Sequence, residues 1–155
     1  MTVATRITAR VLPVNARGEV MLLFGIDPLY TQHPYWFTIG GGVDERESLA
    51  DAGVRELAEE TGIKISSNQL IGPFHGGRHE FAFNGVPWVS ESHFYAVALD
   101  DVSVSFDRHR AGDAGFITYW AWWQPQDLEA DSRLSKPQLP AILEHAVSIV
   151  RKAVP

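Results

Sequence analysis

Residues 41–63 read GGVDERESLADAGVRELAEETGI, and this stretch holds the most regular pattern in the chain. Between Ser48 and Thr61 the apolar residues recur at helical spacing, and Gly62 follows as a stop signal. The pattern predicts a helix over this range. Three glycines at 40–42 come just before it, after the strand-like residues 36–39, and we expect the glycines to form a turn.

Three carboxylates on the predicted helix give the first chemical signal. Glu56, Glu59 and Glu60 stand at positions i, i+3 and i+4, so their side chains project toward one face. Like charges at this spacing repel one another unless water, cations or a hard metal ion compensate them. For such a group by itself, a solvated helix face is the commoner explanation. The preceding glycines favour a site, because backbone without side chains lets a phosphate or a metal approach closely.

The spacing within the whole segment is specific. Gly41 is followed after five residues by Glu47, after seven more by Arg55-Glu56-Leu57, after one by Glu59-Glu60, and after one by Gly62-Ile63. This order matches the Nudix box, Gx5Ex7REUxEExGU with U apolar, at every defined position. The chain therefore resembles the Nudix hydrolases.

The resemblance implies an α/β fold, namely an α/β/α sandwich with a mixed β-sheet and a loop-helix-loop catalytic motif, in a single domain over residues 1–155. It also implies a divalent metal ion as cofactor, Mg²⁺ with Mn²⁺ as an alternative. The metal ligands implied are the backbone carbonyl of Gly40 and the carboxylates of Glu56, Glu59 and Glu60. Oxygen ligands of this kind suit a hard cation such as Mg²⁺.

The implied activity is hydrolysis of a diphosphate linkage by attack of water on phosphorus, as in Mg²⁺-dependent enzymes. A glutamate would remove the proton, and we favour Glu56 as base or co-ligand with Glu60 as its competitor. Asp107 and Asp113, in a later loop, are further alternatives, although plain solvation is the commoner role for loop acids. The resemblance also pairs Glu47 with Arg55, whose guanidinium orients the acids.

Residues outside the box only exclude candidate substrates, because residues typical of certain substrate classes are missing. The proline typical of ADP-ribose hydrolases and the tyrosine typical of dinucleoside polyphosphate hydrolases are both missing. A nucleoside di- or triphosphate, as for MutT-like enzymes, therefore leads. An ADP-ribose or nucleoside-diphosphate-sugar substrate, a non-catalytic nucleotide-sensing domain, and processing of RNA 5′ ends stay open as alternatives.

Five residues are candidate substrate contacts. Gly41 and Gly42 belong to the glycine run, and Trp36 just before it offers an aromatic face for a base, although core packing is its commoner role. Many relatives carry a phosphate-contacting arginine where this chain has Phe24-Gly25. Arg10 and Arg78 are the arginines that would replace that contact.

The other expected elements surround this segment. Strand-like runs at 7–14 and 20–24 predict a hairpin, and 26–35 predicts a loop. Asn84-Gly85 predicts a second hairpin between 80–83 and 86–89, with 93–99 continuing the returning strand. A loop over 100–115, a strand over 117–123 and a helix over 137–150 complete the chain.

Composition excludes several classes of protein. The chain of 155 residues has a formal charge of −6, which gives no general basic surface for nucleic acid, and it has no cysteine for a disulfide or a thiolate zinc site. His75 and His79 lack the helical spacing of paired zinc ligands. No membrane span or signal peptide is expected, so we expect a cytoplasmic protein that acts on a small nucleotide-like molecule. A homodimer is left open.

Overall fold

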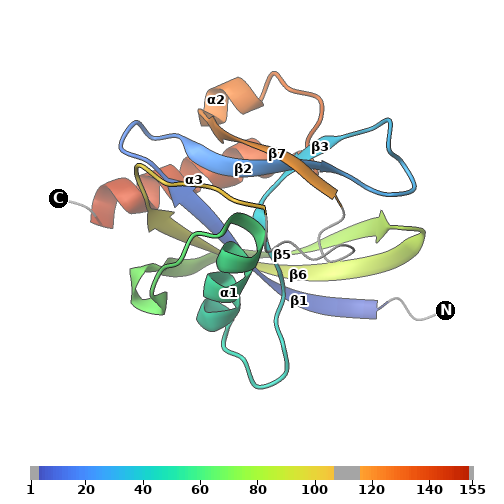
Figure 1. The fold of residues 1–155 in the computed structure, drawn as a ribbon, viewed down its shortest axis with the longest axis horizontal. Helices are drawn as coiled ribbons and strands as arrows, with labels where there is room; N and C mark the ends of the chain where they lie inside the picture. The colour runs from blue at the N-terminus through green and yellow to red at the C-terminus, as the bar shows by residue number, and fades with distance from the viewer. Residues whose placement is uncertain (1–3, 107–115, 154–155) are drawn as a thin grey trace.

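A long central strand organises the fold. The computed structural model describes residues 4–106 and 116–153. In it β1 (Ala4–Val14) pairs in parallel with β6 (Val86–Ala98) along its whole length, and antiparallel with β4 (Ile39–Gly42) on its other side. The remaining strands are β2 (Val20–Ile26) and β5 (Ile71–Phe83), which pair with β1 and β6, and β3 (Tyr35–Phe37) and β7 (Phe116–Trp123), which both pair with β2. The sheet is mixed (Figure 1).

Two helices cover opposite faces of this sheet. Side chains alternate along β1, so Val11 packs toward Leu57 of α1 (Leu49–Thr61), whereas Leu12 packs toward α3 (Leu139–Ala153). The face toward α3 is closed by the buried residues Leu139, Ile142, Leu143, Ala146, Val147 and Val150. The expected α/β/α sandwich with a mixed sheet is therefore confirmed, with α1 and α3 on either side of the sheet (Figure 1).

The hairpins were predicted correctly but their extents were not. β1 meets β2 only at Val14 and Val20 near the turn, because farther along β1 the neighbouring position belongs to β4. β5 and β6 turn at Asn84-Gly85 as expected, although each strand is 13 residues long. The carboxyl-terminal helix occurs at Leu139–Ala153 rather than 137–150. The short helix α2 (Pro125–Leu128), which packs beside α3, and a 3-10 turn at Ser67–Gln69 were not predicted.

The glycine run forms a strand, so the expectation of a glycine turn was wrong. β3 pairs with β2 and β4 pairs with β1, and the chain passes from one pair to the other at Thr38. Gly40 has φ +141°, and a Cβ there would overlap the Ala9 carbonyl oxygen. A conformation of this kind is open to glycine and strained for other residues. The glycines therefore permit close strand pairing at this crossing.

Residues 100–106 lie outside helices and strands, as expected for a loop, while 107–115 lie outside the described residues. β7 forms over the range expected for the last strand. In the described part of the chain, no helix is long and apolar enough to cross a membrane.

Gly40→Ala tests the strand crossing. We expect this change to lower the free energy of unfolding by at least about 2 kcal/mol, because a side chain at Gly40 meets the backbone of β1. Gly77→Ala is the matched control, since nothing lies within 4 Å of a Cβ at Gly77, and we expect a change within about 1 kcal/mol. Urea denaturation of both variants measures the difference. Equal stabilities would contradict the strand assignment of Gly40.

Candidate active site

Helix α1 begins and ends where its capping residues dictate. The Ser48 hydroxyl accepts a hydrogen bond from Asp51 N at 3.1 Å, which satisfies a free amide of the first turn. At the other end Gly62 takes the left-handed conformation and donates its N–H to Ala58 O. These caps fix the register of the helix and so the face on which its glutamates lie.

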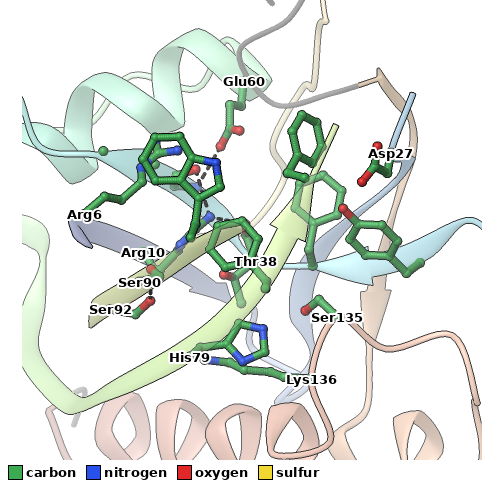
Figure 2. Close-up of a pocket in the computed structure, with 18 of the residues that line it drawn as sticks. Arg6, Arg10, Asp27, Thr38, Glu60, His79, Ser90, Ser92, Ser135 and Lys136 are labelled. Carbon is green, nitrogen blue, oxygen red and sulfur yellow. Dashed lines mark hydrogen bonds between the residues drawn. The ribbon is translucent and has the colours of Figure 1, made fainter. Parts of the chain in front are cut away.

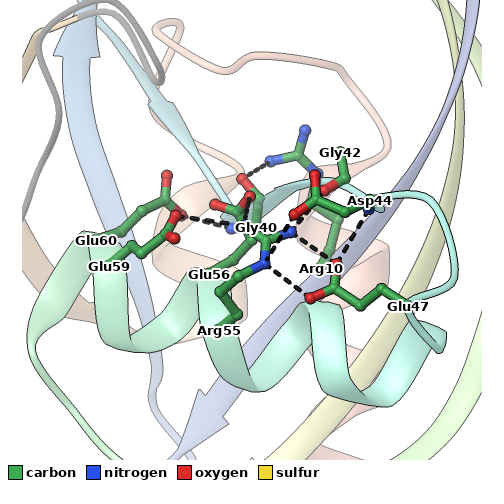
Figure 3. Close-up of polar contacts among 9 residues, drawn as sticks. All are labelled: Arg10, Gly40, Gly42, Asp44, Glu47, Arg55, Glu56, Glu59 and Glu60. Carbon is green, nitrogen blue, oxygen red and sulfur yellow. Dashed lines mark hydrogen bonds and ion pairs between the residues drawn. The ribbon is translucent and has the colours of Figure 1, made fainter.

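Arg55 is the centre of the polar contacts on this helix (Figure 3). Its Nε and Nη2 donate to the two carboxylate oxygens of Glu47, each at 2.8 Å, in a two-pronged ion pair. Nη2 also donates to Gly42 O at 2.9 Å, and Nη1 donates to Glu56 at 3.0 Å and to Glu59 at 3.3 Å. One guanidinium thus links the loop before α1, the end of β4 and the helix.

The ion pair changes the proton affinity of both partners. The hydrogen bonds from Arg55 hold the pKa of Glu47 below its ordinary value, and those to Glu47 raise the pKa of Arg55. Glu47 and Arg55 therefore stay charged over the whole physiological pH range. The structure places this pair as the family resemblance implied.

Glu60 is the buried carboxylate of the group. Its side chain is 3% exposed, its Oε1 accepts from Gly40 N at 2.7 Å, and its Oε2 has no hydrogen-bond partner. Burial, and then the charge of Glu56, raise the pKa of Glu60 to about 8. Burial also raises the pKa of Glu56. Glu56 lies beside Gly41, where a Cβ would come within 2.7 Å of its Oε1.

Arg10 occupies the other side of the glycine strand. Its Nη1 donates to Gly40 O at 2.9 Å and to Thr38 O at 3.3 Å, so it bridges the point where the chain crosses between strand pairs. Burial lowers the pKa of Arg10, while the charge of Glu60 acts in the opposite direction. The carbonyl that the sequence assigned to a metal therefore accepts a hydrogen bond from Arg10 instead.

The glutamates are adjacent but are not gathered into a chelating group. Among the described residues, no set of three or more His, Asp or Glu side chains is arranged to hold a metal ion. The reason is visible in the contacts, because Arg55 draws Glu56 and Glu59 while Gly40 N holds Glu60. The donor set nevertheless suits a hard divalent cation, which binds carboxylate and carbonyl oxygens. The buried, unpartnered Oε2 of Glu60 is the atom that such a cation would satisfy.

The glutamates border a cleft of about 1270 Å³. Its floor is formed by β1, β6 and β5 (Figure 2). Its walls are formed by α1, β3, β4, the loop between β2 and β3, and the loop before α3. Aromatic side chains line much of it, namely Tyr30, Tyr35, Phe37, Phe81, Phe83, Trp88 and Phe94. A space of this size and lining fits a nucleotide-sized ligand.

The structure brings only some of the candidate substrate contacts to this cleft. Gly41, Gly42 and Arg10 line it. Trp36 is 4% exposed and packs against Phe24 and Trp123 with ring centroids 4.6 and 5.0 Å away, in the core beneath α3. Trp36 is absent from the described cleft lining, as is Arg78.

Strand alternation explains the position of Arg78. Its neighbours His79 and Phe81 face the cleft, whereas Arg78 is exposed. Asp107 and Asp113 fall outside the described residues. Three further residues that line the cleft were not predicted from the sequence, namely Arg6, His79 and Lys136. Period-two alternation along β1 and β5 was the signal available for Arg6 and His79.

The chain is an α/β/α sandwich whose helix α1 borders a cleft on the sheet. Residues 4–143 match the family profile described as NUDIX domain, so the chain belongs to the Nudix family. An RNA pyrophosphohydrolase of Novosphingobium aromaticivorans is 27% identical over 134 residues, which cover 76% of each chain. The protein is a hydrolase that acts on phosphoric anhydride bonds.

Solved structures agree with this fold. The MutT protein of Methanosarcina mazei aligns with a TM-score of 0.62 and 21% identity, covering 100% of this chain and 99% of that one. The Escherichia coli dihydroneopterin triphosphate pyrophosphohydrolase aligns with a TM-score of 0.64 and 19% identity, covering 97% and 99%. At these identities the two structures establish the shared architecture.

The raised pKa of Glu60 predicts a pH-dependent stability. The folded metal-free protein binds a proton at Glu60 up to about pH 8, whereas an ordinary glutamate releases it near 4.5. Ionisation therefore favours the unfolded chain, and stability falls as pH rises from about 4.5 to about 8. Glu60→Gln has no carboxyl at this position and so lacks this fall. Between pH 4.5 and pH 8, the free energy of unfolding of the parent should therefore drop relative to that of Glu60→Gln by more than about 1 kcal/mol.

Denaturation in EDTA at a series of pH values measures the effect. Glu144→Gln, on the exposed side of α3, is the control and should follow the parent at every pH. Parallel curves for the parent and Glu60→Gln would show that Glu60 has an ordinary pKa.

Proposed function

We propose that this protein hydrolyses a diphosphate linkage in a nucleoside di- or triphosphate, with a divalent cation held by the α1 carboxylates. The observation that carries the proposal is the position of Glu56 and Glu60 on one wall of an aromatic cleft, with Arg55 fixing the first of them. Family membership supports the bond type, and the cleft supports a substrate with an aromatic base.

The residues proposed to hold the cation are Glu56, Glu59, Glu60 and the carbonyl of Gly40. A divalent cation at this position supplies charge neutralisation on the phosphate oxygens and a nucleophilic water at neutral pH. Mg²⁺ is the proposed ion and Mn²⁺ an alternative. To accept it, Glu56 and Glu59 must turn away from Arg55 Nη1, which keeps its other bonds through Glu47 and Gly42.

Arg6 and Arg10 are proposed to contact the diphosphate. Both line the cleft from β1, and a Cβ built on Gly42 lies 2.9 Å from the Arg6 guanidinium, so this side chain stands over the glycine strand. Their charges face the phosphate oxygens across from the carboxylates. Guanidinium groups bind such oxygens in a two-pronged manner.

Glu56 and Glu60 are the two candidates for the base that takes the proton from water. Glu56 is ion-paired with Arg55, whereas the Oε2 of Glu60 is free and its pKa of about 8 lies near the working pH. These contacts favour Glu60 as the base as well as a metal ligand, and Glu56 as a metal ligand only. The sequence had favoured Glu56 as base or co-ligand, with Glu60 as its competitor.

A second candidate substrate is a triphosphorylated RNA 5′ end. The specific observation in its favour is the relative named RNA pyrophosphohydrolase, which matches across three quarters of this chain. The formal charge of −6 weighs against it, because RNA binding draws on basic surface. ADP-ribose or a nucleoside-diphosphate sugar is the other alternative substrate from the sequence.

A substrate panel with Mg²⁺ tests the proposal, with products identified by mass. The panel contains nucleoside di- and triphosphates, ADP-ribose, a nucleoside-diphosphate sugar and a 5′-triphosphorylated oligonucleotide. We expect turnover of the nucleoside di- or triphosphates. Turnover of the sugar conjugates or the oligonucleotide alone would assign a different substrate.

Glu56→Gln and Glu60→Gln separate the two proposed roles. Loss of the base lowers the rate about 10²- to 10⁴-fold at saturating Mg²⁺. Loss of a metal ligand raises the Mg²⁺ concentration needed for half-maximal rate. We expect both results for Glu60→Gln and only the second for Glu56→Gln, with Glu144→Gln behaving as the parent. Parental activity in both variants would remove these carboxylates from the reaction.

A further inference from the structure

Among the described residues that line the cleft, those of the floor strands β1, β5 and β6 include no acid. The residues of β1, β6 and β5 that line it include Arg6 and Arg10, His79, and Ser90 and Ser92. Thr8 is buried beside the two serines and hydrogen-bonds to both. The acids that line the cleft come from α1 and from two loops. The cleft therefore has an acidic wall and a basic, hydroxyl-bearing floor.

Three hydroxyl groups form the polar centre of that floor. Thr8 Oγ1 lies 2.9 Å from Ser92 Oγ and 3.3 Å from Ser90 Oγ, and the two serine oxygens are 3.2 Å apart. Each hydroxyl has one donor and two acceptor positions. The three O–H groups can therefore donate to one another, and some of the oxygen lone pairs remain available as acceptors. His79 lies directly across the strand pair from Ser90.

Lys136 reaches the same end of the cleft from the loop before α3. Its Nζ lies 4.8 Å from the ring centre of Phe94, and within the described ranges no carboxylate forms an ion pair with it. Burial, and then the charge of Arg10, lower its pKa to about 8. A half-buried ammonium without an acid partner is costly, and an anionic ligand would offset that cost.

His79 shares this environment. In Figure 2, His79 and Lys136 lie side by side, at the end of the cleft opposite Glu60. Burial, and then the charges of Lys136 and Arg10, lower the pKa of His79. Two basic groups, Lys136 and His79, thus lie together at one end of the cleft, and the charge of Arg10, which lies nearer Glu60, also disfavours their protonated forms. That arrangement is typical of a site for a phosphate or a carboxylate.

We propose that Lys136 and His79 form a second anion site, which binds a phosphate ester on the nucleoside part of the substrate, away from the diphosphate that is cleaved. The inference rests on the proposed function and refines it. The substrate class becomes a nucleoside 5′-di- or triphosphate that carries a further phosphate on its sugar. Arg6 and Arg10 serve the diphosphate, and Lys136 and His79 serve the additional group.

Inorganic phosphate tests the site without requiring turnover. The full chain in EDTA is titrated with phosphate while the imidazole proton signals of His79 are followed by NMR, with His79→Gln assigning them. We expect a saturable shift, at least tenfold weaker in Lys136→Met and retained in Lys136→Arg. Lys152→Met, at the far end of α3, is the matched control and should follow the parent. A shift that does not saturate, or one equal in Lys136→Met and the parent, would overturn the proposal.

Paired nucleotides then test the substrate class. For adenosine, guanosine and uridine in turn, calorimetry compares the affinity of the 5′-monophosphate with that of the 2′,5′-bisphosphate and with that of the 3′,5′-bisphosphate. At least one bisphosphate should bind tenfold or more tightly than its monophosphate in the parent, and the ratio should fall to about one in Lys136→Met. Equal affinities throughout would refute a sugar-phosphate site.

The two tests distinguish a failure of the anion site from a failure of the proposed hydrolysis of nucleoside di- or triphosphates. Saturable phosphate binding at His79 in a protein that cleaves no member of the substrate panel would leave the anion site standing and remove the hydrolysis of nucleoside phosphates. The calorimetry also compares UDP-glucuronate, which carries a carboxylate, with UDP-glucose. Tighter binding of UDP-glucuronate, with equal affinities for the monophosphates and bisphosphates, would assign the site to a carboxylate and overturn the phosphate assignment.

Discussion

The ion pair between Arg55 and Glu47 is the interaction on which the rest of the site depends. A guanidinium has five N–H donors in a fixed plane, and here they hold both oxygens of Glu47, the carbonyl of Gly42 and the edge of Glu56. Helix α1, the end of β4 and the loop between them are therefore locked together by one side chain. A lysine has no comparable geometry, so charge alone would not reproduce the arrangement.

The cleft follows from how the chain crosses the sheet. β1 and β2 pair only at Val14 and Val20, next to the turn that joins them, and then diverge. Beyond that point β3 pairs with β2 and β4 pairs with β1, and Thr38 lies between β3 and β4. Arg10 closes that crossing through the carbonyls of Thr38 and Gly40, and Gly40 in turn donates to Glu60. Strand pairing, the buried arginine and the buried carboxylate are thus one connected unit, with acids on one side and bases on the other.

Local signals made the helix and its acids predictable. The stop at Gly62 and the i, i+3, i+4 spacing of the glutamates act within a few residues, and the structure shows both. The helix begins at Leu49, and Ser48 is its cap rather than its first residue. The box resemblance gave the pairing of Glu47 with Arg55. Residues whose role depends on distant partners were not predictable, because the strand pairing of the glycines and the meeting of His79 with Lys136 are decided by sheet register.

The central claim is that the α1 carboxylates form a divalent-metal site once a cation is available. A crystal grown with Mn²⁺ and a slowly hydrolysed nucleotide analogue, measured for anomalous scattering of manganese, tests this most directly. We expect an anomalous peak bounded by oxygens of Glu56 and Glu60 and by the Gly40 carbonyl, with Arg10 turned toward the phosphates. A fully loaded nucleotide with no manganese at these glutamates would contradict it.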